Sequence, residues 1–289
     1  MNESQHYRAA TGHTLRSFQE LRPRERARAL LDEDTFRELL DPFERIRSPW
    51  LERQGIIPQS DDGVVVARGT IDGRPAVCIA TDGAFQGGSL GEVSGAKIAG
   101  SLELALEETR AGRPQAVVLA LDTGGVRLQE ANLGLTAIAE VHAAIVALKS
   151  LVPVIAVIAG PVGCFGGMSI AAALCNRLIM TRDARLGLSG PDVIEQEAGI
   201  AEMDASDRPA IWSIIGGEQR QACSLAHELV ADDIDVIHDA VLRACLQDRA
   251  GGIPGIERIA KHLKWVRSLE PSHPTAPMAL RQRRPEYER

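Results

Sequence analysis

The chain has 289 residues, 45% of them hydrophobic, so it can bury a substantial core in one large or two modest domains. Only 3% of the residues are aromatic and 27 are glycine, a composition typical of α/β layers rather than of a β-sandwich. The net charge of -7 argues against nucleic acid as the main partner. The five cysteines are scattered and never form C-x-x-C, so no disulfide framework or zinc ribbon is indicated and a reducing cytoplasm is expected.

Residues 1–58 are polar, with apolar positions at helical spacing and prolines that interrupt them, and we predict an N-terminal helical arm here. No apolar run opens the sequence, so a secretory signal is not expected. Four arginines cluster in this arm: Arg22, Arg24, Arg26 and Arg28. We interpret them as a solvated helix face, with an acidic carrier or a nucleotide phosphate as the alternative partner.

Residues 59–266 form the predicted main domain. Val64–Val66, a turn at Asp72–Gly73 and Ala76–Ala80 indicate a β-hairpin. Helix and strand patterns then alternate, which predicts βαβ-type crossovers: helices at Lys97–Thr109 and Leu133–Leu148, strands at Val117–Leu121, Pro153–Ala159 and Leu178–Met180. A tail, residues 267–289, is expected to be peripheral or to bind a partner; its prolines and basic residues are Pro271, Pro274, Pro277, Arg281, Arg283 and Arg284.

The stretch Leu151–Cys175 has no charged residue and is long enough by residue count to span a bilayer. Glycines and a proline divide it, beginning at Gly160 and Pro161, into a strand and a short helix. These are the sizes of buried core elements, so we expect no membrane span.

Two places where a strand runs through glycines into a helix are the most informative feature of the chain. Val117–Leu121 leads into Asp122–Gly125, and Pro153–Ala159 leads into Gly160–Gly167 before a helical pattern. At such corners, backbone N–H groups lie unobstructed at the positive end of a helix dipole. Both corners therefore suit an oxyanion hole.

Other glycine and nucleophile motifs do not fit. Neither corner has the G-x-G-x-x-G spacing of dinucleotide folds, and Gly83–Gly88 lacks the Lys and Ser/Thr of a phosphate loop. Ser189 resembles a nucleophile elbow only loosely, because Pro191 occupies the second glycine position. None of the seven histidines belongs to an H-E-x-x-H pair, so no metal site is predicted. His142 lies in an apolar helix pattern, and we interpret it as a hydrogen-bonded core or interface residue.

Several motifs in order resemble the carboxyltransferase domains of the crotonase superfamily, over most of residues 20–245. They are Arg24–Asp32, Phe85–Gly91, Asp122–Glu130, Gly160–Gly167, and Ser189-Gly190-Pro191 with Val193–Gln196. The stretch Val126–Asn132 is most similar to the β subunits of biotin-independent malonate decarboxylases. The resemblance implies an α/β fold, a crotonase-type (ClpP/crotonase) superhelix of ββα units behind the N-terminal helical arm.

The resemblance also implies decarboxylation of a malonyl thioester carried on a phosphopantetheine-type arm, either of an acyl carrier protein or of CoA. The resulting enolate oxygen requires N–H donors, and the candidates are the backbone amides of Gly125, Val126, Gly167 and Met168. Gly124 and Gly166 join Gly125 and Gly167 as positions where a Cβ would obstruct the approach of the thioester. The alternative is that these glycines serve only tight strand-to-helix packing.

By the same resemblance, the stretch Phe85–Lys97 lines the groove for the pantetheine arm, through Gly87, Gly88 and Ser89. An ordinary glycine-rich turn explains it equally well. Gln129, Glu130 and Asn132 follow the first corner and are candidates either for substrate orientation or for helix capping. We assign no proton donor to the enolate, and water can serve.

Departures from the family define the expected partners. The chain has neither a four-cysteine zinc ribbon nor a Met-Lys-Met biotinylation site, and it carries only one crotonase-like unit. A second chain, the γ subunit in the resembling system, is expected to complete the site, with an acyl carrier protein and an acyl transferase α subunit as further partners. Three alternatives stay open: carboxyltransfer to biotin, a noncatalytic scaffold, and an enoyl hydratase or isomerase relying on Glu130.

Overall fold

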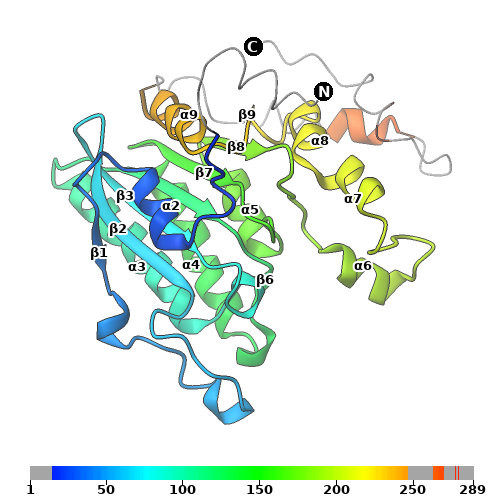
Figure 1. The fold of residues 1–289 in the computed structure, drawn as a ribbon, viewed down its shortest axis with the longest axis horizontal. Coiled ribbons are helices and arrows are strands. Elements are labelled where there is room, and N and C mark those ends of the chain that lie inside the picture. The colour runs from blue at the N-terminus through cyan, green and yellow to red at the C-terminus, as the bar shows by residue number, and fades with distance from the viewer. Residues whose placement is uncertain (1–14, 247–262, 270–276, 278, 280–289) are drawn as a thin grey trace.

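The computed structural model describes residues 15–246, 263–269, 277 and 279. A seven-stranded sheet with the order β1-β2-β3-β5-β7-β8-β9 forms its centre (Figure 1). The strands are β1 (Arg37–Leu39), β2 (Val64–Ile71), β3 (Arg74–Thr81), β5 (Ala116–Leu121), β7 (Val154–Ile158), β8 (Arg177–Thr181) and β9 (Glu228–Val230). The first three strands pair antiparallel, and the strands from β3 to β9 pair in parallel.

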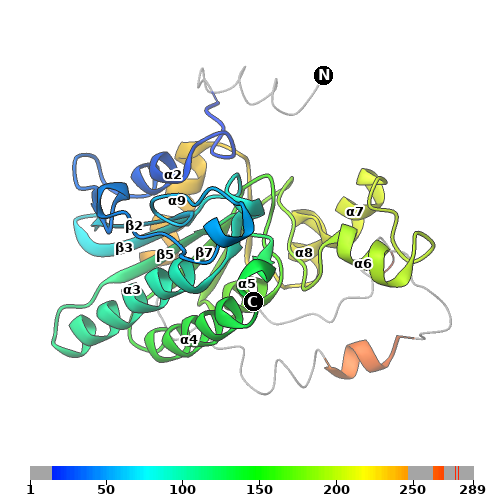
Figure 2. The ribbon, with the colours of Figure 1, turned by 90° about the horizontal axis from the view of Figure 1, so that it is seen from below.

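Helices cover both faces of this sheet (Figures 1 and 2). The helices of one face are α3 (Glu92–Arg110), α4 (Leu133–Leu148) and α5 (Gly167–Leu174); those of the other are α2 (Pro23–Ala29) and α9 (Ile234–Leu246). Residues of each central strand alternate between the two cores, as Val117 and Leu119 do on one side and Val118 and Ala120 on the other. Burial on both faces explains why these strands are continuous apolar runs.

A second, small sheet is formed by segments that follow the carboxyl ends of β3 and β5. The strands β4 (Ser89–Leu90) and β6 (Gly125–Val126) pair in parallel, and single bridges join Thr123 to Cys164 and Cys164 to Leu186. A core strand is thus followed by a short second strand or bridge and then by a helix. This repeated ββα unit is the predicted crotonase-type superhelix.

Three short helices form a lobe at one side of the sheet: α6 (Pro191–Ala198), α7 (Arg208–Ile215) and α8 (Gly217–Ala222) (Figure 2). Ile211 and Ile215 of α7 pack with Phe165 in a separate small core. The lobe is therefore attached to the loop that contains the second glycine corner.

The N-terminal segment is less helical than its pattern predicts. In its described part, α2 has 7 residues, short 3-10 turns occupy Pro42–Glu44 and Glu52–Gln54, and Arg37–Leu39 form the edge strand β1. The prediction of helix across this strand is wrong because Asp32 binds the hairpin turn, accepting from the backbone N–H groups of Asp72 and Gly73. The chain after it runs extended beside β2. The divisions at residues 58 and 267 stay predictions.

The tail residues singled out in the sequence, from Pro271 and Pro274 to Arg281, Arg283 and Arg284, lie outside the described residues. The uncharged stretch Leu151–Cys175 divides into β7 and α5, as predicted. Within the described ranges, no helix has both the length and the apolar character needed to cross a membrane.

Candidate active site

Three glycine loops meet where neighbouring parallel strands end. The segment after β3 contains Gly87 and Gly88, the first corner follows β5, and the second corner follows β7. The carboxyl ends of adjacent parallel strands share one edge of the sheet, which is the usual place for a ligand in α/β folds. The structure therefore brings together all three of the loops that the sequence singles out.

The two corners touch through Gly125 and Gly166. A Cβ built on Gly166 would lie 3.0 Å from the Cα of Gly125, and one built on Gly125 would lie 3.3 Å from the Cα of Gly166. Both glycines also have positive φ angles, +111° and +61°, which disfavour any residue with a Cβ. Side chains are thus excluded where the corners meet.

The second corner contains two N–H groups that have no acceptor, called open below; Gly167 is half-buried and Met168 is buried. Gly166 is the N-cap of α5, and the N–H groups of Gly167 and Met168 follow as the first of the helix. Among the residues that the structure describes, neither amide has a hydrogen-bond acceptor, whereas the next one, Ser169, donates to the Gly166 carbonyl at 3.1 Å. Because the dipole of α5 also favours negative charge at this end, the two amides are suited to an oxyanion.

The first corner is tied into the small sheet. The Gly124 N–H donates to the Gly87 carbonyl at 2.9 Å, and the Gly125 N–H donates to Thr123 Oγ1 at 3.1 Å. Val126 pairs with Leu90 in the β4–β6 ladder. Gly125 and Val126 therefore lie against the open amides of α5, but the Gly125 amide already has an acceptor inside the chain.

The Gly87–Ser89 loop packs directly on the first corner. A Cβ on Gly88 would lie 2.2 Å from the Asp122 carbonyl oxygen, so only glycine fits. At Gly87 a Cβ would meet no atom within 4 Å, and its φ of +64° disfavours other residues. Ser89 Oγ donates to the Gln86 carbonyl at 2.8 Å, within its own turn.

Asp122 holds the two corners together, a role that the sequence did not indicate. Its carboxylate accepts the N–H groups of Val162 at 2.9 Å and Gly163 at 3.2 Å, and Arg26 of α2 donates to it at 3.1 Å. Arg26 is 4% exposed, so its interpretation as part of a solvated helix face is wrong. A carboxylate directly after a buried strand signals that it needs a partner, but nothing in the sequence identifies Arg26 as that partner.

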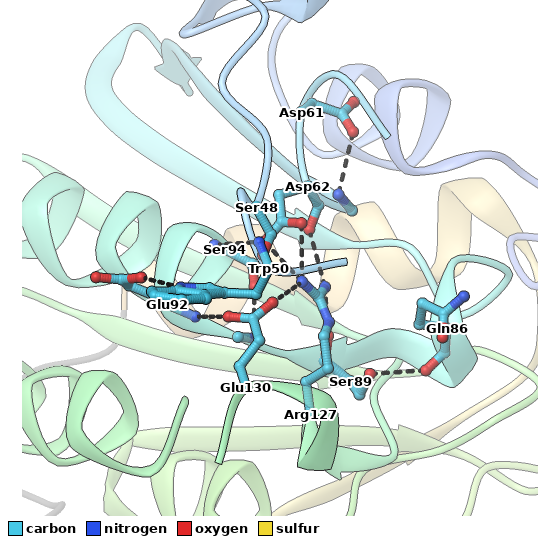
Figure 3. A network of polar contacts seen from close by, with 12 residues as sticks. Ser48, Trp50, Asp61, Asp62, Gln86, Ser89, Glu92, Ser94, Arg127 and Glu130 are labelled. Carbon is cyan, nitrogen blue, oxygen red and sulfur yellow. Dashed lines mark hydrogen bonds and ion pairs between the residues drawn. The ribbon is translucent and has the colours of Figure 1, made fainter. Parts of the chain in front are cut away.

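A buried ionic cluster lies behind the first corner (Figure 3). The Arg127 guanidinium donates to Asp62 Oδ1 at 2.8 Å and to Glu130 Oε1 at 2.9 Å, and all three side chains are 0% exposed. Ser94 N–H donates to Asp62, and Glu92 N–H donates to Glu130. Burial raises the pKa of Asp62 above its ordinary value, while the Arg127 charge opposes this shift.

This cluster removes Glu130 as an acid or base for substrate, because its carboxylate faces Arg127 and the backbone rather than an open surface. The hypothesis of an enoyl hydratase or isomerase depended on Glu130 as the acid or base, so it is no longer supported. Asn132 is the N-cap of α4 but makes no capping hydrogen bond with its side chain, and Gln129 is exposed. His142 of α4 binds the Gly167 carbonyl, with 2.7 Å between Nε2 and the oxygen, as expected of a hydrogen-bonded residue.

No group of three His, Cys, Asp or Glu side chains within the described ranges could hold a metal ion. At the meeting point of the loops the structure places backbone amides and the N-terminal end of the α5 dipole.

Comparisons with known proteins give the family of this chain. The carboxyl transferase domain family matches residues 19–242. The malonyl-S-ACP:biotin-protein carboxyltransferase MADC of Malonomonas rubra is 41% identical over 274 residues, which cover 89% of this chain and 86% of that protein. The methylmalonyl-CoA carboxyltransferase 12S subunit of Propionibacterium freudenreichii subsp. shermanii is 36% identical over 73% of this chain and 37% of its own length.

Solved structures show the same relationship. A chain of a Pseudomonas malonate decarboxylase hetero-tetramer in complex with malonate has a TM-score of 0.89 and 58% identity, covering 98% of this chain and 100% of that one. The transcarboxylase 12S structure with methylmalonyl-coenzyme A has a TM-score of 0.65 and 31% identity, covering 83% of this chain and 42% of that one. These matches confirm the predicted resemblance and fold: the chain belongs to the carboxyl transferase domain family.

Proposed function

We propose that this chain is the β subunit of a malonyl-S-acyl-carrier-protein decarboxylase, which releases carbon dioxide from the malonyl thioester and leaves an acetyl thioester. The observation that carries the proposal is the pair of open N–H groups, Gly167 and Met168, which begin α5 beside the glycines of the first corner. The similarity to the Pseudomonas malonate decarboxylase chain supports the choice of substrate.

The reaction needs little else from this chain. The bond between the α-carbon and the carboxylate breaks, carbon dioxide leaves, and the electron pair moves into the thioester carbonyl as an enolate. The α-carbon then takes a proton, for which water suffices. Donors placed at the enolate oxygen stabilise the charge that develops as the bond breaks, and loss of one such donor costs about 3 kcal/mol of barrier.

The pantetheine arm would enter along Gly87, Gly88 and Ser89, with Gly124 opposite. The support is steric: Gly124 is exposed, and Gly87 leaves open space where a side chain would stand. The arm belongs to an acyl carrier protein or to CoA, and no biotin is attached to this chain.

A second chain would complete the site, and we propose the γ subunit for this role. The similar Pseudomonas chains come from a hetero-tetramer and from an MdcD-MdcE hetero-dimer, and this chain covers only 42% of the transcarboxylase chain. The acyl carrier protein and the acyl transferase α subunit are proposed as further partners in the same assembly. A cytoplasmic location fits this set of partners.

The second candidate is transfer of the malonyl carboxyl group to biotin, which the name of the Malonomonas relative favours. Both reactions pass through the same enolate and use the same amides. The test is to purify the chain with its partner subunits and to measure carbon dioxide release from malonyl carrier, with and without an added biotin carrier protein. Release without biotin supports the decarboxylase, and formation of carboxybiotin alone supports the transferase. If neither product forms, the noncatalytic scaffold is the remaining interpretation.

A further inference from the structure

The peptide group between Gly167 and Met168 is held from two helices. Its N–H is one of the two open donors at the start of α5, and its carbonyl accepts a hydrogen bond from His142 of α4 at 2.7 Å. A carbonyl oxygen can only accept, so Nε2 of His142 carries the proton in this contact. The imidazole and the proposed oxyanion therefore lie on opposite sides of one planar peptide.

We infer that His142 is a positioning residue for the enolate donor, and this inference rests on the proposed function. Because the peptide is planar, a hydrogen bond to its carbonyl fixes the direction in which the Met168 N–H points. The same bond polarises the amide and strengthens its N–H as a donor, by about a tenth to a third per bond in condensed phases. His142 thus acts through the backbone without touching the substrate.

The placement of α4 makes this contact a link between the two glycine corners. This helix follows the first corner, and its packing face carries Ile138 one turn before His142. Ile138 also meets the second corner: a Cβ on Gly167 would lie 2.6 Å from its Cγ2. One face of α4 therefore sets both the distance of α5 from the first corner, through Ile138, and the orientation of its first peptide, through His142.

A matched contact exists at the other end of the same helix pair. Lys149, which follows α4, donates from Nζ to the Leu174 carbonyl at 2.9 Å, at the last residue of α5. It resembles the His142 contact in type, in partner helix and in partial burial, but it lies at the end of α5 that faces away from the proposed donors. Lys149→Met is therefore the control variant: it removes a similar contact between α4 and α5 without affecting the proposed donors.

The test uses the assembled complex with its partner subunits and compares His142→Phe, His142→Gln and Lys149→Met in carbon dioxide release from malonyl carrier. We expect His142→Phe to lower kcat about tenfold with KM within twofold, which is less than the 100-fold typical of losing a donor outright. His142→Gln, whose amide nitrogen can donate from a similar place, should recover most of this loss. Lys149→Met should leave kcat unchanged and lower only the Tm.

Wild-type kcat in His142→Phe, or an equal loss in Lys149→Met, would overturn the inference. It is overturned as well if His142→Phe and His142→Gln both fail to assemble, since the bond is then structural. A wild-type complex that releases no carbon dioxide removes the proposed function and the inference together, whereas an active wild type with an unaffected His142→Phe removes the inference alone.

Discussion

The substitution Gly167→Ala tests the close packing of α5 on α4. The new Cβ would lie 2.6 Å from Ile138 Cγ2, where ordinary contacts begin at 3.4 Å. Either Ile138 or the first turn of α5 must therefore shift by about 1 Å, and a misplacement of this size at the donors can cost on the order of 100-fold in rate. Overpacking of this kind also costs roughly 1–3 kcal/mol of stability. The expected result is a kcat lowered about 100-fold with little change in KM.

The assay is carbon dioxide release by the assembled complex, and two further variants make it specific. Gly167→Ala combined with Ile138→Ala removes the clash and should recover most of kcat, although truncating Ile138 alone costs about 2–5 kcal/mol of stability. Gly100→Ala, in the exposed interior of α3 with no atom within 4 Å of the new Cβ, should leave kcat unchanged. Wild-type kcat in an assembled Gly167→Ala complex would refute the packing argument.

Two predictions concern stability. Arg127→Met leaves the carboxylates of Asp62 and Glu130 buried without their cation and should lower the free energy of unfolding by about 3–5 kcal/mol in urea titrations; a loss below about 1 kcal/mol contradicts the assignment. Hydrogen bonds from Thr70 and from the turn N–H groups hold the pKa of Asp32 below its ordinary value. The Asp32 carboxylate therefore contributes fully to the free energy of unfolding above its unfolded pKa, near 3.9. This contribution is lost as the pH falls through the folded pKa. Asp32→Asn should lower the Tm at pH 7, and the gap from wild type should close in acid; a gap that widens in acid contradicts this sign.

The sequence predicted the strands and the glycine corners well because both depend on local pattern. Val117–Leu121 and Pro153–Ala159 are apolar runs bounded by glycine, and the structure places a strand in each. The N-terminal segment was harder. Leu39 and its neighbours have helical spacing, but Asp32 binds a turn that lies far along the chain, and this tertiary contact turns the segment into an edge strand.

The candidate site was predictable only in its glycines. A glycine that must approach another backbone, such as Gly125 against Gly166, leaves a visible trace in the sequence. The sequence does not show which amide lacks an acceptor. The Gly125 N–H donates to the Thr123 side chain, whereas the Met168 N–H has no acceptor among the described residues. The contacts of Asp122 with Arg26 and of His142 with Gly167 join distant segments, so no local pattern could indicate them.

The most direct test of the central claim replaces the backbone amide N–H of Gly167, or that of Met168, by an ester oxygen. The ester keeps every side chain and removes one donor at the start of α5. If these amides stabilise the enolate, at least one of the two esters should lower kcat for carbon dioxide release by about 100-fold to 1,000-fold in the assembled complex. Turnover within threefold of wild type in both esters would contradict the account.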